Sequence, residues 1–209
     1  MTKAEIIELV KGWLSSESTT MDMMHRVDKR RLELYISVSY QDMLYEMFKK
    51  NTEGLSLYVK TFKDVTVSQD TDTEVWSAEI SASIMQLPGT ASAIRRISTN
   101  KGKTLEFVPV DAEIAEAIGM LDVSDVNINS CIGYCLRNNN LIEFINFPAS
   151  LSATKLRIDA LISFSSYADT DEVYLASGQA NVLLQGVIGL LTGRKTVDLV
   201  NDNAEENVK

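Results

Sequence analysis

The spacing of apolar residues predicts helices at the start of the chain. Apolar residues recur at helical spacing over residues 2–14, and Thr2 and Glu5 fit the Thr-x-x-Glu pattern of a capping box. A longer helix is expected over about residues 24–50, with two apolar stripes. The first stripe comprises Leu32, Ile36, Tyr40, Met43 and Met47, and the second comprises Leu34, Val38, Tyr45 and Phe48. This pattern fits either one wide buried face or a helix that packs both on its own core and on a neighbouring subunit.

The middle of the chain changes to period-two alternation, which indicates strands. Between Trp76 and Ile84, apolar residues alternate with serine and glutamate. Residues 92–110 are expected to form a hairpin that turns near Asn100–Gly102, followed by a short helix near 111–119. The stretch "CLRNNNLIEFINFP" (135–148) predicts a second hairpin with an asparagine turn, and residues 156–164 predict a further strand.

A last helix is expected over residues 168–194. Asp169 and Glu172 form a cap pair at its start, and Gly193 followed by two cations suits its end. Three glycines are costly inside a helix, so they are expected where another backbone packs closely. These glycines are Gly178, Gly186 and Gly189, and they are candidate interface positions.

These elements predict an α+β fold in which the N-terminal and C-terminal helices pack together, with a segregated antiparallel β region between them. Residues 1–60 form an N-terminal helical segment, and residues 61–167 form the β-rich region with its short helix. The helix over 168–194 packs on the N-terminal helices, and residues 195–209 form an extended polar tail. Three isolated apolar residues in that tail are further candidate interface positions: Val197, Leu199 and Val200.

The composition narrows the possible partners. The 209-residue chain has a net charge of −9 and a pI of about 4.7, and its basic residues are scattered. Tight wrapping of DNA is therefore not expected, whereas an acidic surface suits a protein that DNA passes without sticking. No signal peptide is expected at the N-terminus. No membrane span is expected either, because the most apolar stretch, Val173–Leu191, is interrupted by serine, glutamine, asparagine and glycine.

Catalytic patterns are weak throughout the chain. The single histidine, His25, lies among basic residues and has no nucleophile motif beside it. Cys131 and Cys135 would lie roughly 13 Å apart on one strand, which is too far for a disulfide. The acidic runs at 70–74 and 168–172 suit turns and helix caps better than a calcium site. We therefore predict no enzymatic activity, no cofactor and no metal.

The order of elements resembles that of the head-to-tail connector proteins (adaptor, or tail-accessory ring) of tailed bacteriophages. The resemblance covers about residues 24–203 and rests on the long early helix, the hairpin "CLRNNNLIEFINFP", the strand "KLRIDALISFSSY" and the helix "DTDEVYLASGQANVLLQGVIGLLTGR". The segment "SAIRRISTNKGKTLEFVPVD" is similar to an arginine-bearing hairpin of that family. Alternation places Arg95 and Arg96 on opposite faces of their strand, and both are candidate interface residues.

The resemblance implies a structural virion protein that is made in the bacterial cytoplasm and assembles at the capsid–tail junction. It would form a ring of about twelve copies through one repeated interface. Its expected partners are other copies of itself, the portal protein, the next tail ring or tail protein, and genomic DNA that passes through without sequence-specific binding. Three alternatives stay open: a tail-completion or stopper protein, a hydrolase with an unfamiliar carboxylate site, and a host-surface binding module.

Overall fold

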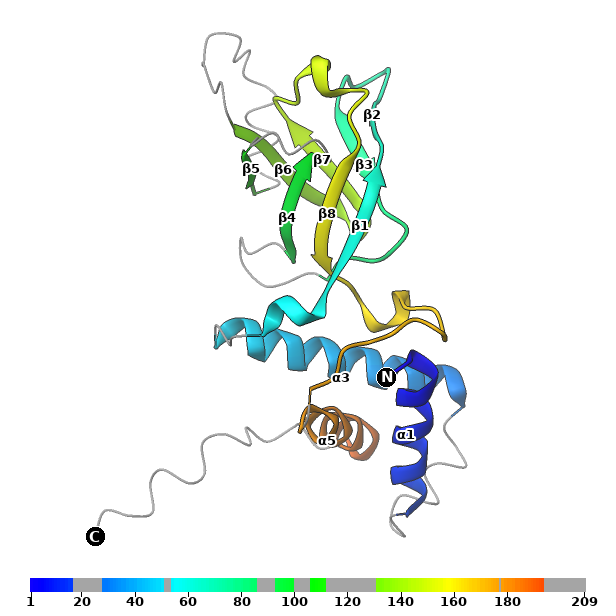
Figure 1. The fold of residues 1–209 in the computed structure, drawn as a ribbon. Helices are drawn as coiled ribbons and strands as arrows, with labels where there is room; N and C mark the ends of the chain where they lie inside the picture. Colours follow the sequence, from blue (N-terminus) through cyan, green and yellow to red (C-terminus); the bar gives the residue numbers. More distant parts are fainter. Residues whose placement is uncertain are drawn as a thin grey trace, which may run out of the picture. The chain divides into compact units, whose positions relative to one another are not determined.

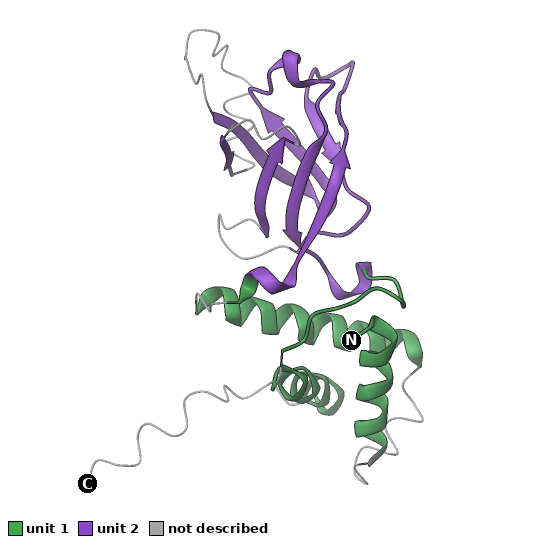
Figure 2. Ribbon diagram, viewed as in Figure 1, with its two compact units in different colours: residues 1–55, 167–209 green, residues 56–166 purple. Residues whose placement is uncertain are grey.

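The computed structural model describes residues 1–16, 28–50, 54–85, 93–99, 106–111, 131–176 and 178–193. The chain divides into two compact units, shown in Figure 2: unit 1 comprises Met1–Leu55 and Tyr167–Lys209, and unit 2 comprises Ser56–Ser166. Helices at both ends of the chain flank the strands, so the predicted α+β class is confirmed.

Helix α1 (Lys3–Ser16) begins with the expected capping box. The Thr2 backbone N–H donates to the Glu5 carboxylate (2.8 Å), and the Glu5 N–H donates to the Thr2 hydroxyl (3.2 Å). Each side chain thereby satisfies a backbone donor that the first turn leaves without a helical partner. The apolar side of the helix is buried and consists of Ile6, Ile7, Val10 and Leu14.

Helix α3 (Lys29–Lys49) buries only one of its two apolar stripes. The Asp28 side chain caps its first turn by accepting a hydrogen bond from the Arg31 N–H at 2.7 Å. In the second stripe, Leu34 is 59% exposed and Val38 is 37% exposed, which excludes one wide buried face. The buried side consists of Leu32, Ile36, Ser39, Tyr40, Met43 and Leu44.

Helix α5 (Gln179–Thr192) starts later than the sequence pattern predicts. The preceding residues run beside the N-terminus instead: the Lys3 N–H donates to the Asp171 carbonyl (3.0 Å), and the Val173 N–H donates to the Met1 carbonyl (2.8 Å). A backbone that pairs with the first residues of the chain cannot also be helical. The expectation that Asp169 and Glu172 cap this helix is therefore wrong.

The strands that the structure describes in unit 2 form two β-sheets, which are visible in Figure 1. One sheet has the order β1-β8-β4, and the other has the order β2-β3-β7-β6-β5. All pairings are antiparallel except that of β5 with β6, which is parallel. The strand bounds are Val59–Val65 (β1), Val67–Gln69 (β2), Trp76–Glu79 (β3), Ile94–Thr99 (β4), Glu106–Pro109 (β5), Cys131–Asn138 (β6), Leu141–Ile145 (β7) and Leu156–Leu161 (β8).

One of the two predicted hairpins forms. Strands β6 and β7 pair around Asn139 and Asn140, as the asparagine turn predicts. The hairpin expected over 92–110 is wrong, because β4 pairs with β8 in one sheet and β5 pairs with β6 in the other. The short helix expected near 111–119 lies outside the described residues.

The core of unit 2 follows strand alternation only in part, because β8 also buries Asp159 and Leu161 between its alternating positions. In β8, Leu156, Ile158 and Ala160 are fully buried, and Ile142 and Phe144 of β7 are buried in the second sheet. Strands β1 and β2 are separated by one residue, so the chain passes from one sheet to the other at that point. A register shift and a positive φ of 59° at Asp64 accompany this passage.

Candidate interface surfaces

The closest helix contact in unit 1 involves one of the candidate glycines. A Cβ atom added to Gly186 of α5 would lie 2.8 Å from the Ser39 hydroxyl oxygen and 3.0 Å from the Ser39 Cβ on α3. The first distance is shorter than real Cβ contacts, and the second is tighter than nearly all of them. Gly186 therefore lets α5 approach α3 closely, as the sequence predicted, and this contact lies within one chain.

The other two candidate glycines behave differently. Gly178 precedes α5 with a φ of 89°, a left-handed conformation that glycine adopts without strain, and an added Cβ would meet nothing within 4 Å. Gly178 thus starts the helix and makes no close packing contact there. Gly189 is half-buried on α5, and its carbonyl lies 3.4 Å from the Thr192 hydroxyl. Gly193 ends the helix with a φ of 64°, as predicted.

A buried lysine joins three segments of unit 1. Lys3 is 5% exposed, and its ammonium donates to the Tyr167 carbonyl at 2.9 Å and forms an ion pair with Glu33 of α3. Burial of a cation is tolerated because both partners lie in direct contact with it. The sequence analysis does not single out Lys3, because its partners are 30 and 164 residues away along the chain.

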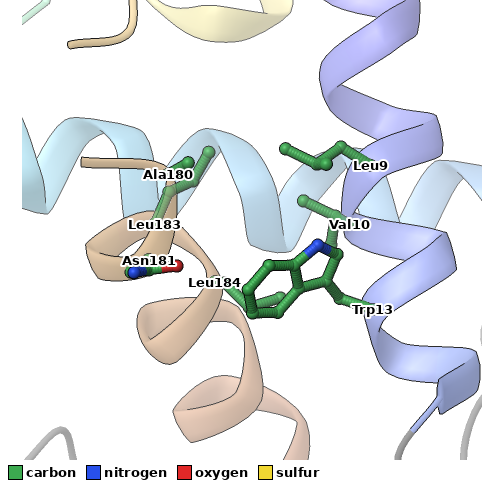
Figure 3. Close-up of a pocket in the computed structure, with 7 residues that line it drawn as sticks. All are labelled: Leu9, Val10, Trp13, Ala180, Asn181, Leu183 and Leu184. Carbon is green, nitrogen blue, oxygen red and sulfur yellow. The ribbon is translucent and has the colours of Figure 1, made fainter. Parts of the chain in front are cut away.

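A small apolar groove with a volume of about 20 Å³ lies between α1 and α5, and Figure 3 shows its lining. Helix α1 contributes Leu9, Val10 and Trp13, and α5 contributes Ala180, Asn181, Leu183 and Leu184. The Trp13 indole is 49% exposed at the edge of this groove, whereas Val10 and Leu183 form buried walls. Asn181 supplies the only side-chain polar group besides the indole N–H. We call this feature the α1–α5 groove.

We call the second stripe of α3 the α3 ridge and define it as Leu34, Val38, Tyr45 and Phe48. Leu34 and Val38 are exposed, whereas Tyr45 and Phe48 are half-buried. At about 100° per residue, Leu34 lies roughly opposite Met43, on the side of α3 away from the buried face. Ser39 belongs to the buried face and contacts α5. The α3 ridge and the α1–α5 groove therefore lie on opposite sides of α3.

The start of α3 carries an unusual concentration of positive charge. Lys29, Arg30 and Arg31 occupy its first turn, which contains no acidic residue. Lys29 lies 3.7 Å from the Asp169 carboxylate, but Arg30 and Arg31 are exposed and form no ion pair within the part of the chain that the structure describes. Cations at the positive end of a helix dipole are unfavourable, so nearby anions would stabilise this turn.

The structure places both candidate arginines of β4 at the surface. Regular alternation would put Ile94 and Ile97 on opposite faces, yet both are buried. A register shift between Ile94 and Arg96 accounts for this, because the extra residue restores both isoleucines to the core side. Arg95 and Arg96 are consequently both exposed. Arg96 lies opposite Asp159, whose carboxylate accepts hydrogen bonds from Thr61 (2.6 Å) and Arg157 (3.2 Å).

The acidic runs serve local structure. The Asp70 carboxylate accepts hydrogen bonds from the N–H groups of Asp72 (2.9 Å) and Thr73 (2.8 Å), and these bonds hold its pKa below the ordinary value. The Asp171 carboxylate accepts from the Ala168 N–H at 3.1 Å. Among the described residues, no group of three or more potential ligands is arranged to hold a metal ion.

Several candidate residues lie outside the described part of the chain: His25, Val197, Leu199 and Val200. Cys131 and Cys135 are described, and neither is in a disulfide. None of the described helices is long and apolar enough to cross a membrane.

Comparison with known proteins gives no family for this chain. No protein-family model matches it, and no curated protein matches it either. The arrangement of its own surfaces is therefore the basis for the functional proposal.

Proposed function

We propose that this protein is a structural component of a tailed bacteriophage, a ring that joins the portal vertex of the capsid to the tail and lets DNA pass. The observation that carries the proposal is the exposed apolar ridge on the central helix of unit 1, with Leu34 59% exposed and Val38 37% exposed. Apolar residues repeated along one exposed helix face indicate a surface that another molecule covers. The order of elements supports the same class.

The charge of the chain suits a DNA conduit. With a net charge of −9, the protein repels phosphates on average and does not retain DNA as it passes. Specific contacts are expected with other copies of the chain, with the portal protein and with the next tail component. The proposed location is the capsid–tail junction of the virion.

The tail after Gly193 is the proposed contact with the portal. Residues 195–209 carry Val197, Leu199 and Val200 in an otherwise polar sequence, which suits an extended arm that docks on a partner. We expect deletion of 195–209 to abolish binding to the portal ring of the same phage while the melting temperature stays within about 2 °C of the full chain.

A pull-down of the full and shortened chains with that portal ring measures the effect, and circular dichroism verifies the fold. Equal retention of both chains would contradict the role of the tail. Failure of the full chain to bind would contradict the placement at the portal.

A further inference from the structure

The two sheets of unit 2 differ in the sign of their exposed charge. On the five strands of the larger sheet, the exposed charged residues are Glu79 and Glu106. In the sheet of β1, β8 and β4, including the residue before β8, the exposed anion is Asp64. The exposed cations there are Lys63, Arg95, Arg96, Lys155 and Arg157. This basic sheet is an exception in a chain whose net charge is −9.

The strand register places two of these arginines on the outer face of the basic sheet. Arg96 and Thr61 both lie opposite Asp159, and residues directly opposite each other share a face. Arg157 precedes Asp159 by two residues in β8, so alternation places it on that face as well. Ile158 lies between them and is fully buried, which identifies the other face as the core side.

Asp159 orients the guanidinium group of Arg157. Its residue is only 9% exposed, and its carboxylate accepts a hydrogen bond from Arg157 Nε at 3.2 Å. This bond leaves the two terminal amino groups of the guanidinium for another acceptor, and the Arg157 side chain is 46% exposed. Arg96, opposite the same carboxylate, is exposed and forms no ion pair within the described part of the chain.

The chemistry of this face fits phosphate groups. Guanidinium groups that are oriented and exposed bind phosphate oxygens through paired hydrogen bonds, and Lys63 and Lys155 add positive charge nearby. The strands of this sheet expose no aromatic side chain on which unpaired bases could stack. A duplex backbone therefore fits the face better than a single strand.

We infer that the outer face of the β1-β8-β4 sheet contacts the phosphate backbone of double-stranded DNA. The inference rests on the proposed DNA conduit and identifies the surface of unit 2 that the DNA meets. Phosphate contacts carry no sequence information, so any DNA sequence can pass. The negative charge of the rest of the chain keeps the contact weak and sensitive to salt, which lets the DNA move.

Fluorescence anisotropy with a labelled duplex of about 30 base pairs tests this contact on the full chain. We expect binding at about 50 mM salt that weakens as salt is added. The double variant Lys63→Gln and Arg96→Gln should bind at least about ten-fold more weakly at that salt, and its salt slope should fall by about 2. Arg157 stays unchanged in this variant, because it is the partner of the nearly buried Asp159.

A matched variant controls for net charge. Arg30→Gln combined with Arg31→Gln also removes two exposed cations, but from unit 1. It should bind the duplex within about two-fold of the unchanged chain, because neither arginine belongs to the basic sheet. Circular dichroism and the melting temperature verify that both variants are folded.

Three results would overturn the inference. These are no duplex binding by the unchanged chain at about 50 mM salt, equal losses in the two double variants, and displacement of the duplex by polyglutamate at the same charge concentration. The last result would identify an acidic protein as the partner.

The portal assay separates this inference from the proposed function. Normal rings on the portal, formed by a chain whose duplex binding does not depend on Lys63 and Arg96, would leave the function standing and remove the DNA-contacting face. Duplex binding that depends on these two residues, without any binding to the portal, would support the face and contradict the proposed function.

Discussion

Gly186 sets how closely α5 approaches α3, and its replacement tests this contact. In Gly186→Ala, the new methyl group would overlap the Ser39 side chain, whose Cβ lies only 3.0 Å away, so Ser39 must shift or the two helices must move slightly apart. We expect a loss of about 1–3 kcal/mol in the free energy of unfolding, although alanine is favoured over glycine in helices by about 1 kcal/mol. Urea denaturation measures the change.

A second glycine provides the matched control. Gly12 lies within α1, and an added Cβ would meet nothing within 4 Å. Gly12→Ala should therefore stabilise the protein by about 0.5–1 kcal/mol. The double variant Ser39→Gly and Gly186→Ala should recover part of the loss. Equal effects of alanine at both glycines would show that the close approach has no energetic role.

Tyr167 gives unit 1 a dependence on alkaline pH. Burial raises the pKa of Tyr167 above its ordinary value near 10, the charge of Asp171 raises it further, and a hydrogen bond with Tyr40 acts in the opposite direction. The folded state therefore holds the phenol proton more tightly than the unfolded state. The resulting stability is fully present below about pH 10 and is lost as the pH rises above that value.

Tyr167→Phe isolates this contribution. At pH 8 the variant should be less stable by about 1 kcal/mol, because phenylalanine lacks the hydroxyl through which Tyr167 interacts with Tyr40. The difference between the wild type and the variant should shrink as the pH rises from 9 to 11. A difference that stays constant over this range in urea denaturation would contradict the raised pKa.

At the scale of elements, sequence reasoning succeeds where the signal is local. The capping box of α1 joins residues three apart, and the asparagine turn of the β6–β7 hairpin is two residues long. It fails where the pairing is distant. Nothing between residues 92 and 110 reveals that β4 pairs with β8, about 60 residues later. The acidic residues before α5 match a helix cap, but their backbone is held by the first residues of the chain.

The interface candidates also divide into those with a local sequence signal and those that depend on distant parts of the chain. The second stripe of α3 was visible as a repeated spacing, and the structure shows that Leu34 and Val38 are exposed. The groove was not visible, because its two walls are about 170 residues apart and Trp13 looks like an ordinary core residue. The exposure of both Arg95 and Arg96 follows from a register shift that alternation does not encode.

The two stripes of α3 predict opposite responses to charge. Glutamate in place of Leu34 should change the free energy of unfolding by less than about 0.5 kcal/mol, because Leu34 is 59% exposed. Ile36→Glu buries an unpaired carboxylate in the first stripe, where Ile36 is fully buried, and should unfold unit 1. Circular dichroism with urea titration compares the variants, and equal losses would show that the ridge belongs to the core.

At the scale of the whole molecule, unit 1 is built from both ends of the chain. Its first part ends at Leu55 and its second begins at Tyr167, with unit 2 inserted between them. Helix α5 therefore reaches α3 only after the whole of unit 2 has been synthesised. The sequence predicted this packing of terminal helices, since both ends carry helical periodicity and the middle carries alternation.

The function depends most directly on ring formation at a portal. The measurement is mass photometry of the purified chain mixed with the portal ring of its own phage, with negative-stain microscopy of the product. We expect a second ring of about twelve copies stacked on the portal. A monomer in the absence of the portal fits this account. The account would be contradicted if adding the chain left the mass of the portal ring unchanged at both low and high salt.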